Sequence, residues 1–458
     1  MRIDPRPLLA CDDVEGLRAR FRGEILLPGD AGYDAARAVF NTMIDRRPAL
    51  VARATGVADV MAALELAAAR KLGISVRGGG HNIAGHAVCD GGLMLDLGRM
   101  KGIHVDPAAR TARVQPGVTW GEIDRENAAL GMFMPGGAVS TTGIAGLTLG
   151  GGIGWASRKL GLVCDHLTSV DIVTVDGRFL TADASRHAEL FWGVRGGGGN
   201  FGVVTSFTYR LHPIEPVLAG ALVHPRARGI EVLRFCREVH RAAPDALSVY
   251  VAFDHAPDGE PIVVVMPVHI GAVEDGLRLV EPLRRFGPPT EDHVRPMLYP
   301  ALQSMLDAQA PWGIFNYWKS SYLKGLDDGA IDIITAFAAR APSLLSTVMI
   351  EHVGGAIRRV AKDATAFCHR DVEYNLLIMA KWRRPEETAA NVQWARDFWS
   401  AMQPHAIDAV YVNYVEPGAE GAARTGAAYG PHLARLAALK RAYDPDNRLR
   451  HNQNIVPA

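Results

Sequence analysis

The stretch SVRGGGHN, residues 75–82, places a histidine directly after three consecutive glycines. Glycine loses more backbone entropy on folding than any other residue, so a glycine triplet requires a compensating interaction. Successive glycine N–H groups can form a concave anion-binding site that a ligand approaches closely. His81 is therefore placed where it can touch a bound ligand. The ordinary alternative is a loop histidine that hydrogen-bonds to a carbonyl.

Two further glycine clusters, GIAGLTLGGGIG and RGGGGNFG, follow within the region that ends at Gly202. Neither a P-loop GxxxxGK[ST] motif nor a correctly spaced Rossmann GxGxxG motif is present. Three clusters, each after a strand-like run, favour a long ligand such as a dinucleotide laid across several loops. His86 forms an i,i+5 pair with His81, but that spacing suits neither a helix nor a strand, so no metal site is predicted.

The elements that must position these loops change in character along the chain. Up to about residue 210, strands and helices alternate, and TWGEIDRENAALG predicts a helix with a capping box from Thr119 to Glu122. From about residue 215, the strand-like runs are typical of a larger sheet: ALVHP, LSVYVAF, PIVVVMPVHI, YNLLIMAKW and AVYVNYV. IEVLRFCREVHRAA and HLARLAALKRAY predict helices in the second half.

Composition limits the class of protein. A chain of 458 residues predicts two or three domains, and 49 basic against 49 acidic residues favour neither nucleic acid nor an anionic membrane as partner. The sequence has no secretory signal pattern and no apolar run of about 18 residues. Five scattered cysteines indicate free thiols in a reducing compartment. We therefore expect a cytoplasmic enzyme.

Four motifs together carry a resemblance to a known family: RGGGHN, GLTLGGGIGWASRKLGL, ELFWGVRGGGGNFGVVTSFTYRLHP and YDPDNRLRHNQNI. They resemble the berberine-bridge-enzyme group of flavoproteins, which has the vanillyl-alcohol-oxidase (PCMH) type of FAD-binding fold. The resemblance covers about residues 28–210 and about 374 to the end. It implies an α+β fold whose FAD-binding domain has two parts, residues 1–210 and 413–458. A substrate-binding domain of antiparallel sheet backed by helices, residues 211–412, would lie between them.

The resemblance also implies how FAD is held. His81 matches the histidine that is joined covalently to the flavin, and a neutral imidazole is a suitable nucleophile. Relatives with a second link carry a cysteine where this chain has Val139, so a single link is expected, with Cys164 merely buried near the flavin. Thr142 matches a gate over the oxygen-reactive face of the flavin. Because threonine has nearly the shape of the oxygen-compatible valine, an oxidase is favoured over a dehydrogenase.

Backbone donors and a few side chains would hold the rest of FAD. The expected cofactor-binding residues, in addition to His81, Val139 and Thr142, are Arg77, Gly78, Gly79, Gly80, Asn82, Gly85, Gly143, Gly146, Gly150, Gly152, Gly154, Val204, Asn452 and Asn454.

Candidate catalytic residues follow from the same resemblance. Asn375 stands where some relatives have a glutamate base, and an asparagine cannot be a general base. Other relatives use the last tyrosine of a YxNYxD-like motif, here YVNYVEPG, which indicates Tyr414. A tyrosine pKa of about 10 must fall by about 2–3 units for a neutral-pH base, and a nearby cation would help. Lys381 shares a strand face with Asn375 and is the candidate cation. Tyr414 could instead pack over the flavin and position substrate.

Three functions remain open. The first is an oxidase that passes hydride from an alcohol, a sugar or secondary-metabolite hydroxyl, to covalent FAD and then to O2. The second is an amine oxidase of the hydroxynicotine-oxidase type, suggested by RHNQNI, whose neutral amine substrate needs no base. The third is a binding protein that has kept the fold and lost its chemistry. Tyr411 and Asn413, expected on the opposite strand face from Tyr414, are second candidates for the site. The sequence leaves the substrate and the oligomeric state open.

Overall fold

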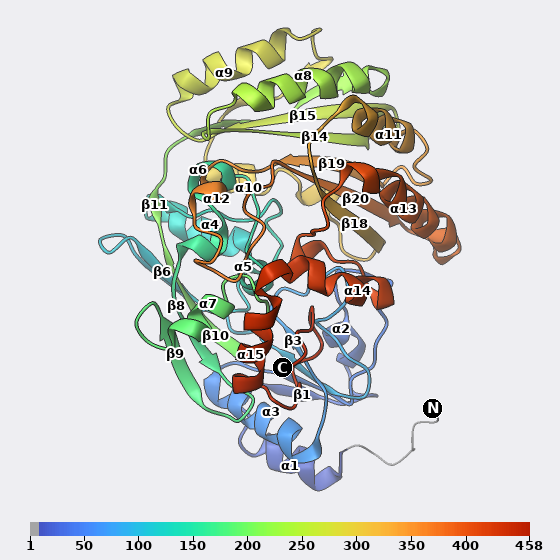
Figure 1. Ribbon diagram of the computed structural model, residues 1–458. Coiled ribbons are helices and arrows are strands. Elements are labelled where there is room, and N and C mark those ends of the chain that lie inside the picture. Colours follow the sequence, from blue (N-terminus) through green and yellow to red (C-terminus); the bar gives the residue numbers. More distant parts are fainter. Residues whose placement is uncertain (1–8) are drawn as a thin grey trace.

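The computed structural model describes residues 9–458, which form two smaller sheets beneath one large sheet (Figure 1). The first sheet has the order β1-β2-β4-β3, with parallel pairing of β2 with β4 and of β4 with β3. Helix α3 (Val57–Arg70) packs on this sheet, and α1 (Cys11–Arg18) packs on α3. The strands are β1 (Glu24–Leu26), β2 (Leu50–Arg53), β3 (Ile74–Arg77) and β4 (Leu93–Asp96).

The second sheet is antiparallel and has the order β5-β6-β10-β8-β9. Its strands are β5 (Ile103–Asp106), β6 (Thr111–Val114), β8 (Leu167–Val173), β9 (Phe179–Asp183) and β10 (Val203–Arg210). The accompanying helices are α4 (Trp120–Ala129), α5 (Ile144–Leu149), α6 (Ser157–Leu160) and α7 (Ala188–Gly193). The predicted capping box is confirmed, because the backbone N–H of Thr119 donates to Glu122 Oε2 at 2.7 Å.

The third sheet has nine antiparallel strands, along the path β16-β13-β15-β14-β19-β20-β18, with β12 paired to β15 and β17 paired to β12. The predicted strands ALVHP, LSVYVAF, PIVVVMPVHI and YNLLIMAKW are all present. The bounds are β12 (Val217–Ala219), β13 (Leu222–Pro225), β14 (Leu247–His255), β15 (Pro261–His269), β16 (Glu291–Asp292), β17 (Arg295–Met297), β18 (Phe315–Leu323), β19 (Thr347–His352) and β20 (Tyr374–Trp382).

Helices cover the outer face of this sheet in Figure 1, and its other face is turned toward the smaller sheets. The covering helices are α8 (Gly229–Ala242), α9 (Val273–Arg285), α11 (Asp328–Ala338) and α13 (Thr388–Met402). Strand β20 is buried along its whole length, as its nearly continuous apolar sequence requires. Leu376 and Ile378 pack into the helix-covered core, whereas Leu377 and Met379 belong to the cluster on the opposite face. The antiparallel sheet backed by helices matches the expected fold class.

The C-terminal segment returns to the first part of the molecule. Helices α14 (Gly418–Tyr429) and α15 (Leu433–Tyr443) lie beside the smaller sheets in Figure 1. Lys440 Nζ anchors them by donating to Asn200 O at 2.9 Å and to Asp444 Oδ2 at 2.7 Å. The lysine is buried, so the ion pair fixes the tail on the scaffold that carries the glycine loops.

The predicted strand AVYVNYV is wrong. Val412–Tyr414 form a short 3-10 turn instead. The hydroxyl of Tyr411 accepts the N–H groups of Gly152 at 3.0 Å and Ile153 at 3.2 Å. These contacts hold the segment against the second glycine cluster, so the chain does not add to the edge of the large sheet.

Several short strands and helices complete the fold. Strand β7 (Met132–Phe133) pairs with β11 (His212–Pro213), and α10 (Tyr299–Gln303) packs on α4. The remaining short helices are α2 (Tyr33–Arg37) and α12 (Ala356–Arg359). Within residues 9–458, a helix with the length and apolarity of a membrane span is not found.

Candidate cofactor and active site

A cavity of about 850 Å³ runs from the glycine loops to the inner face of the nine-stranded sheet. All three glycine clusters contribute to its wall, as does the C-terminal segment. Of the expected cofactor-binding residues, the wall includes Gly78, Gly79, Gly80, His81, Asn82, Val139, Thr142, Gly143, Gly146, Gly150, Val204 and Asn452. The cavity also meets Gly198, Gly199, His86, His451 and Gln453, which were not among them.

The glycine-lined end of the cavity fits a long polar ligand. A Cβ added at Gly146 or Gly199 would meet no protein atom within 4 Å, so these glycines leave room that protein packing does not use. Asn452 Oδ1 and Gln453 Nε2 are buried and have no hydrogen-bond partner within the described part of the chain. Buried polar atoms are nearly always paired, so these two atoms suit a ligand with its own donors and acceptors.

Five expected cofactor residues do not line the cavity. The Arg77 guanidinium uses four of its five N–H donors on Asp96, at 3.0 and 2.7 Å, and on the carbonyls of Ala36 and Ala38, so it is held away from the cavity. The others are Gly85, Gly152, Gly154 and Asn454.

The three glycines in that group are required by packing. A Cβ on Gly85 would lie 2.6 Å from the Ile44 side chain, and one on Gly154 would lie 2.1 Å from Gly136 O. Gly152 has φ +88°, a conformation that favours glycine, and its N–H binds the hydroxyl of Tyr411. These residues shape the loop without bordering the cavity.

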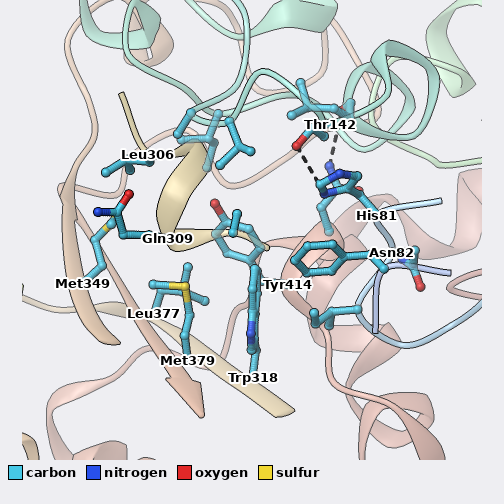
Figure 2. A pocket seen from close by; sticks show the side chains of 18 of the residues that line it. His81, Asn82, Thr142, Leu306, Gln309, Trp318, Met349, Leu377, Met379 and Tyr414 are labelled. Carbon is cyan, nitrogen blue, oxygen red and sulfur yellow. Dashed lines mark hydrogen bonds between the residues drawn. The ribbon is translucent and has the colours of Figure 1, made fainter. Parts of the chain in front are cut away.

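His81 stands in the cavity wall between aromatic and hydroxyl groups. Its ring stacks on Phe40 with centroids 4.5 Å apart and an interplanar angle of 16°. Nε2 lies 3.1 Å from Thr141 Oγ1, and Nδ1 lies 3.5 Å from Thr142 Oγ1. Figure 2 shows His81 beside Thr142. Burial lowers the pKa of His81 to about 4. The imidazole is therefore neutral near pH 7, with a lone pair available.

The residues considered for a second flavin link are placed differently. Val139 lines the cavity, and a valine cannot form a covalent link. Cys164 is fully buried outside the cavity wall, and burial raises the pKa of its thiol far above the ordinary value. A thiol that is neither ionised nor facing the cavity is not a nucleophile toward a ligand there.

A carboxyl group that the sequence reasoning missed lies at the centre of the site. Glu351, on β19, accepts a hydrogen bond from the Tyr414 hydroxyl at 3.0 Å and from Asn375 Nδ2 at 2.6 Å. Its side chain is 2% exposed, and this burial raises the pKa of Glu351 to about 7 despite the two hydrogen bonds, which act to lower it. A carboxyl group with a pKa near neutrality is suited to accept a proton at physiological pH.

The expected activation of Tyr414 by a cation is not found. Burial, and then the neighbouring Glu351 carboxylate, raise the pKa of Tyr414 well above its usual value. Lys381 lies farther along the sheet, where its Nζ donates to Thr347 Oγ1 at 3.0 Å and to Gln309 O at 3.1 Å. The partner of the Tyr414 hydroxyl is therefore an acid and not an ammonium group.

Tyr414 divides the cavity into two ends. Figure 2 shows it between His81 on one side and Met349 and Met379 on the other. Trp318 also lines the cavity and meets the Tyr414 ring edge-on, with centroids 6.1 Å apart. The part of the cavity next to Tyr414 on this side is apolar, because Leu377 and both methionines face it, so it suits the body of an organic substrate.

Tyr411 and Asn413 lie on the same side of the site as Tyr414, contrary to the expectation from a strand. All three line the cavity, and Tyr411 meets Tyr414 edge-on with centroids 4.8 Å apart. Asn413 Nδ2 donates to the Tyr411 hydroxyl at 2.8 Å and to Leu147 O at 3.2 Å. The 3-10 turn brings these side chains together, so that the Tyr411 ring packs against the Tyr414 ring.

The signal for Glu351 was present but unspecific. It is a single carboxylate in the apolar run TVMIEHV, which forms a buried strand. A charged residue is rarely buried without a partner. Its position opposite Asn375 is given by the β19–β20 register, which the sequence does not state.

Comparisons with known proteins agree with this geometry. Residues 48–183 match a family profile described as FAD binding domain, and residues 410–456 match one described as berberine and berberine like. An FAD-linked oxidoreductase of Dictyostelium discoideum is 31% identical over 452 residues, which cover 98% of this chain and 96% of the relative. The (R)-6-hydroxynicotine oxidase of Paenarthrobacter nicotinovorans is 30% identical over 457 residues, which cover 95% and 97%.

Solved structures show the same fold. The 6-hydroxy-D-nicotine oxidase of Arthrobacter nicotinovorans aligns with a TM-score of 0.89 and 28% identity over 100% of both chains. The berberine-bridge-enzyme-like protein 1 of Physcomitrella patens aligns with a TM-score of 0.87 and 25% identity, over 97% of this chain and 99% of that chain. The fold and the cavity thus define an FAD-dependent flavoprotein. The chain belongs to the berberine-bridge-enzyme-like family of FAD-linked oxidoreductases.

Proposed function

We propose that this FAD-linked oxidoreductase is an oxidase that removes hydride from the carbinol carbon of a small-molecule alcohol, with O2 as the final electron acceptor. The hydrogen-bonded pair of Tyr414 and Glu351 carries the proposal. It places a proton acceptor with a pKa of about 7 at the junction between the glycine-lined end and the apolar end of the cavity.

FAD, when bound, supplies the hydride acceptor of this chemistry. The chain itself must hold the substrate hydroxyl and take its proton, because loss of hydride from an alcohol requires loss of the hydroxyl proton. The Tyr414 hydroxyl accepts that proton while its own proton passes to Glu351. Asn375 fixes the second carboxylate oxygen, so the acceptor keeps one orientation. Tyrosine in this route needs no lowered pKa, since it is never left as a free tyrosinate.

We also propose that His81 holds FAD through one covalent bond and that Thr142 borders the path of O2. The neutral His81 imidazole and the open glycine backbone beside it support the first statement. The position of Thr142 in the cavity wall, 3.5 Å from the His81 ring, supports the second. Glycine N–H groups and the Asn452 and Gln453 side chains would hold the remainder of FAD.

An amine is the second candidate substrate class. A buried carboxylate in the substrate end of the cavity can bind an ammonium group before its proton is lost. The relatives named as hydroxynicotine oxidases match over nearly the whole chain. For a neutral amine no base is required, so Glu351 would act chiefly in binding.

A panel of alcohols and amines tests the two classes. The purified yellow holoenzyme is mixed anaerobically with each compound while bleaching of the flavin is followed, and peroxide is measured after air is admitted. Bleaching by an alcohol that is lost in Glu351→Gln supports the first class. Bleaching by amines, with a Glu351→Gln effect confined to apparent affinity, supports the second. Absence of bleaching by either class would contradict both.

A further inference from the structure

Lys381 is a buried cation whose donors are not all used. Its side chain lies in the cavity wall and is 5% exposed. Nζ donates to Thr347 Oγ1 and to Gln309 O, and within residues 9–458 no carboxylate approaches it within 4.0 Å. An ammonium group has three donors, so one remains. The charge nearest to it, that of Asp254, reaches it only through the Thr347 hydroxyl, which donates to Asp254 Oδ2 at 3.2 Å. Because Lys381 makes no direct ion pair, the remaining donor is suited to an anionic group of a ligand.

The register of the sheet fixes where this cation lies relative to the proton acceptor. Thr347, beside Lys381 Nζ, and Glu351, beside the Tyr414 hydroxyl, are four residues apart on β19. Residues with even separation point to one face of a strand, and four residues span about 13 Å. Both residues line the cavity, so the two polar sites look into the same space.

The space between the two sites is apolar. It is bordered by the middle residues of β19 and β20 and by neighbouring residues of β14 and β15: Met349, Leu377, Met379, Ala252, Val264 and Met266. Unbranched methionine side chains adapt to ligands of varied shape. The cavity therefore combines a reacting end, a flexible apolar passage and a cationic end.

We propose that Lys381 binds a carboxylate at the end of the substrate remote from the reacting carbon. This inference rests on the proposed oxidation at the Glu351–Tyr414 end. It defines the substrate class as an amphipathic acid, with an oxidisable hydroxyl or amine, an apolar body and a terminal carboxylate. Lys381 is then a specificity-determining residue and not part of the proton route.

The acidic groups near the cavity mouth do not oppose this assignment. Asp254 already accepts the Thr347 hydroxyl at 3.2 Å and the N–H of His255 at 2.8 Å. Glu351 lies at the other end of the strand, and the remaining acidic wall residues are exposed, where water and salt screen them: Asp258, Glu260 and Glu291. Lys381 is buried, so its charge is screened less than the charges of these three residues.

A binding experiment separates this role from a purely structural one. The holoenzyme is titrated with a homologous series of unreactive straight-chain carboxylates and with their methyl esters, and the change in flavin absorbance reports affinity. We expect a carboxylate to bind about 10-fold or more tightly than its ester, as for a hydrogen bond to a charged group. Lys381→Met should abolish the preference while leaving ester affinity unchanged.

Two controls keep the outcome decisive. Lys324→Met removes an exposed lysine that also donates to a carbonyl, that of Pro404 at 3.0 Å, and should leave the preference intact. If Lys381→Met does not fold, Thr347→Val, which removes one of the two groups that aim Nζ, should reduce the preference. A lysine that only ties Gln309 to the sheet would, when replaced, weaken acid and ester alike and lower the melting temperature.

Equal affinity of the parent enzyme for acids and esters, or no binding of either, would overturn the inference. So would a preference that persists in Lys381→Met. These results do not depend on turnover, because the binding probes carry no oxidisable group. The matching ω-hydroxycarboxylates then test the proposed oxidation separately: if they bind through Lys381 but never bleach the flavin, the proposed function fails and the carboxylate site stands.

Discussion

The Tyr414 hydroxyl donates to Glu351 Oε1 at 3.0 Å, although the two residues are 63 positions apart and come from different parts of the fold. The second oxygen of Glu351 accepts from Asn375 at 2.6 Å. Glu351 thus has one oxygen fixed to the sheet and the other fixed to the C-terminal segment. The hydrogen-bonded pair of Tyr414 and Glu351 therefore forms only when the C-terminal segment is docked on the sheet.

Replacement of Tyr414 or Glu351 should slow reduction of the flavin. We expect Tyr414→Phe and Glu351→Gln each to lower the anaerobic reduction rate by about 10²- to 10⁴-fold with an alcohol substrate, the usual contribution of general base catalysis. FAD content should be unchanged. Stopped-flow absorbance measures the rate, and a loss confined to substrate affinity would show that Tyr414 only packs against the substrate.

The reduction rate should rise with pH through about 7. Glu351 accepts a proton only when ionised, and its pKa is about 7, so activity is lost as the pH falls below that value. Asn375→Leu removes a hydrogen bond that lowers the pKa of Glu351, so the rising limb should move to higher pH. The reduction rate is measured as a function of pH for the parent and for Asn375→Leu, and the pH at the midpoint of each rise is compared. Coinciding limbs would assign the titration to another group.

Glu351→Gln should stabilise the protein at alkaline pH. The folded-state pKa of about 7 exceeds the ordinary 4.5, so burial favours the protonated form and its stabilising contribution is lost as pH rises from 4.5 through 7. Relative to the parent, the variant should gain up to about 3 kcal/mol above pH 8 and much less at pH 5. Thermal unfolding at both pH values measures this; a gain independent of pH would refute it.

Acid precipitation tests the covalent attachment. We expect parent protein to retain its yellow colour in the acid pellet and His81→Ala to release FAD into the supernatant, because Val139, at the position of a second link, cannot form a bond to the flavin. Cys164→Ala is the matched control, since its thiol is buried outside the cavity. Colour in the His81→Ala pellet, or its loss in Cys164→Ala, would contradict this attachment.

Two glycines separate cofactor binding from folding. A Cβ at Gly146 meets no protein atom within 4 Å, whereas one at Gly79 would lie 2.5 Å from Gly143 Cα. Gly146→Ala should therefore fold normally but bind FAD at least about 10-fold more weakly, as for a loss of about 1.4 kcal/mol. Gly79→Ala should give little folded protein. Normal FAD affinity in Gly146→Ala, measured by reconstitution, would place the cofactor elsewhere.

Local sequence signals were sufficient for much of the fold. The Thr119–Glu122 capping box depends on residues three positions apart, and the alternation along β20 follows from strand geometry. Both are encoded within a few residues, so the sequence predicts them correctly. The YVNYV segment has the same strand-like pattern, but its long-range contacts to Gly152 and Ile153 hold it in a turn.

Only part of the site could be predicted from local sequence signals. His81 and most of the glycines border the cavity as expected. A cluster of loop glycines is itself a sequence signal for backbone that a ligand can approach closely. Glu351 meets Asn375 and Tyr414 through strand register and domain docking, neither of which has a local sequence signal. Arg77 was predicted to bind FAD because its charge suits a phosphate. In the structure it pairs with the buried carboxylate of Asp96 instead.

The tail that carries Tyr414 is also fixed by a buried ion pair, in which Lys319 on β18 donates to Glu416 at 2.6 Å. During biosynthesis the large sheet is finished once Trp382 has emerged, yet at that moment the chain has neither its tyrosine nor Asn452 and Gln453 for the cofactor. Under the proposed function, a nascent or truncated polypeptide would neither consume substrate nor release peroxide. Its oxidising chemistry would then begin only after the C-terminal segment has been synthesised and has docked on the sheet.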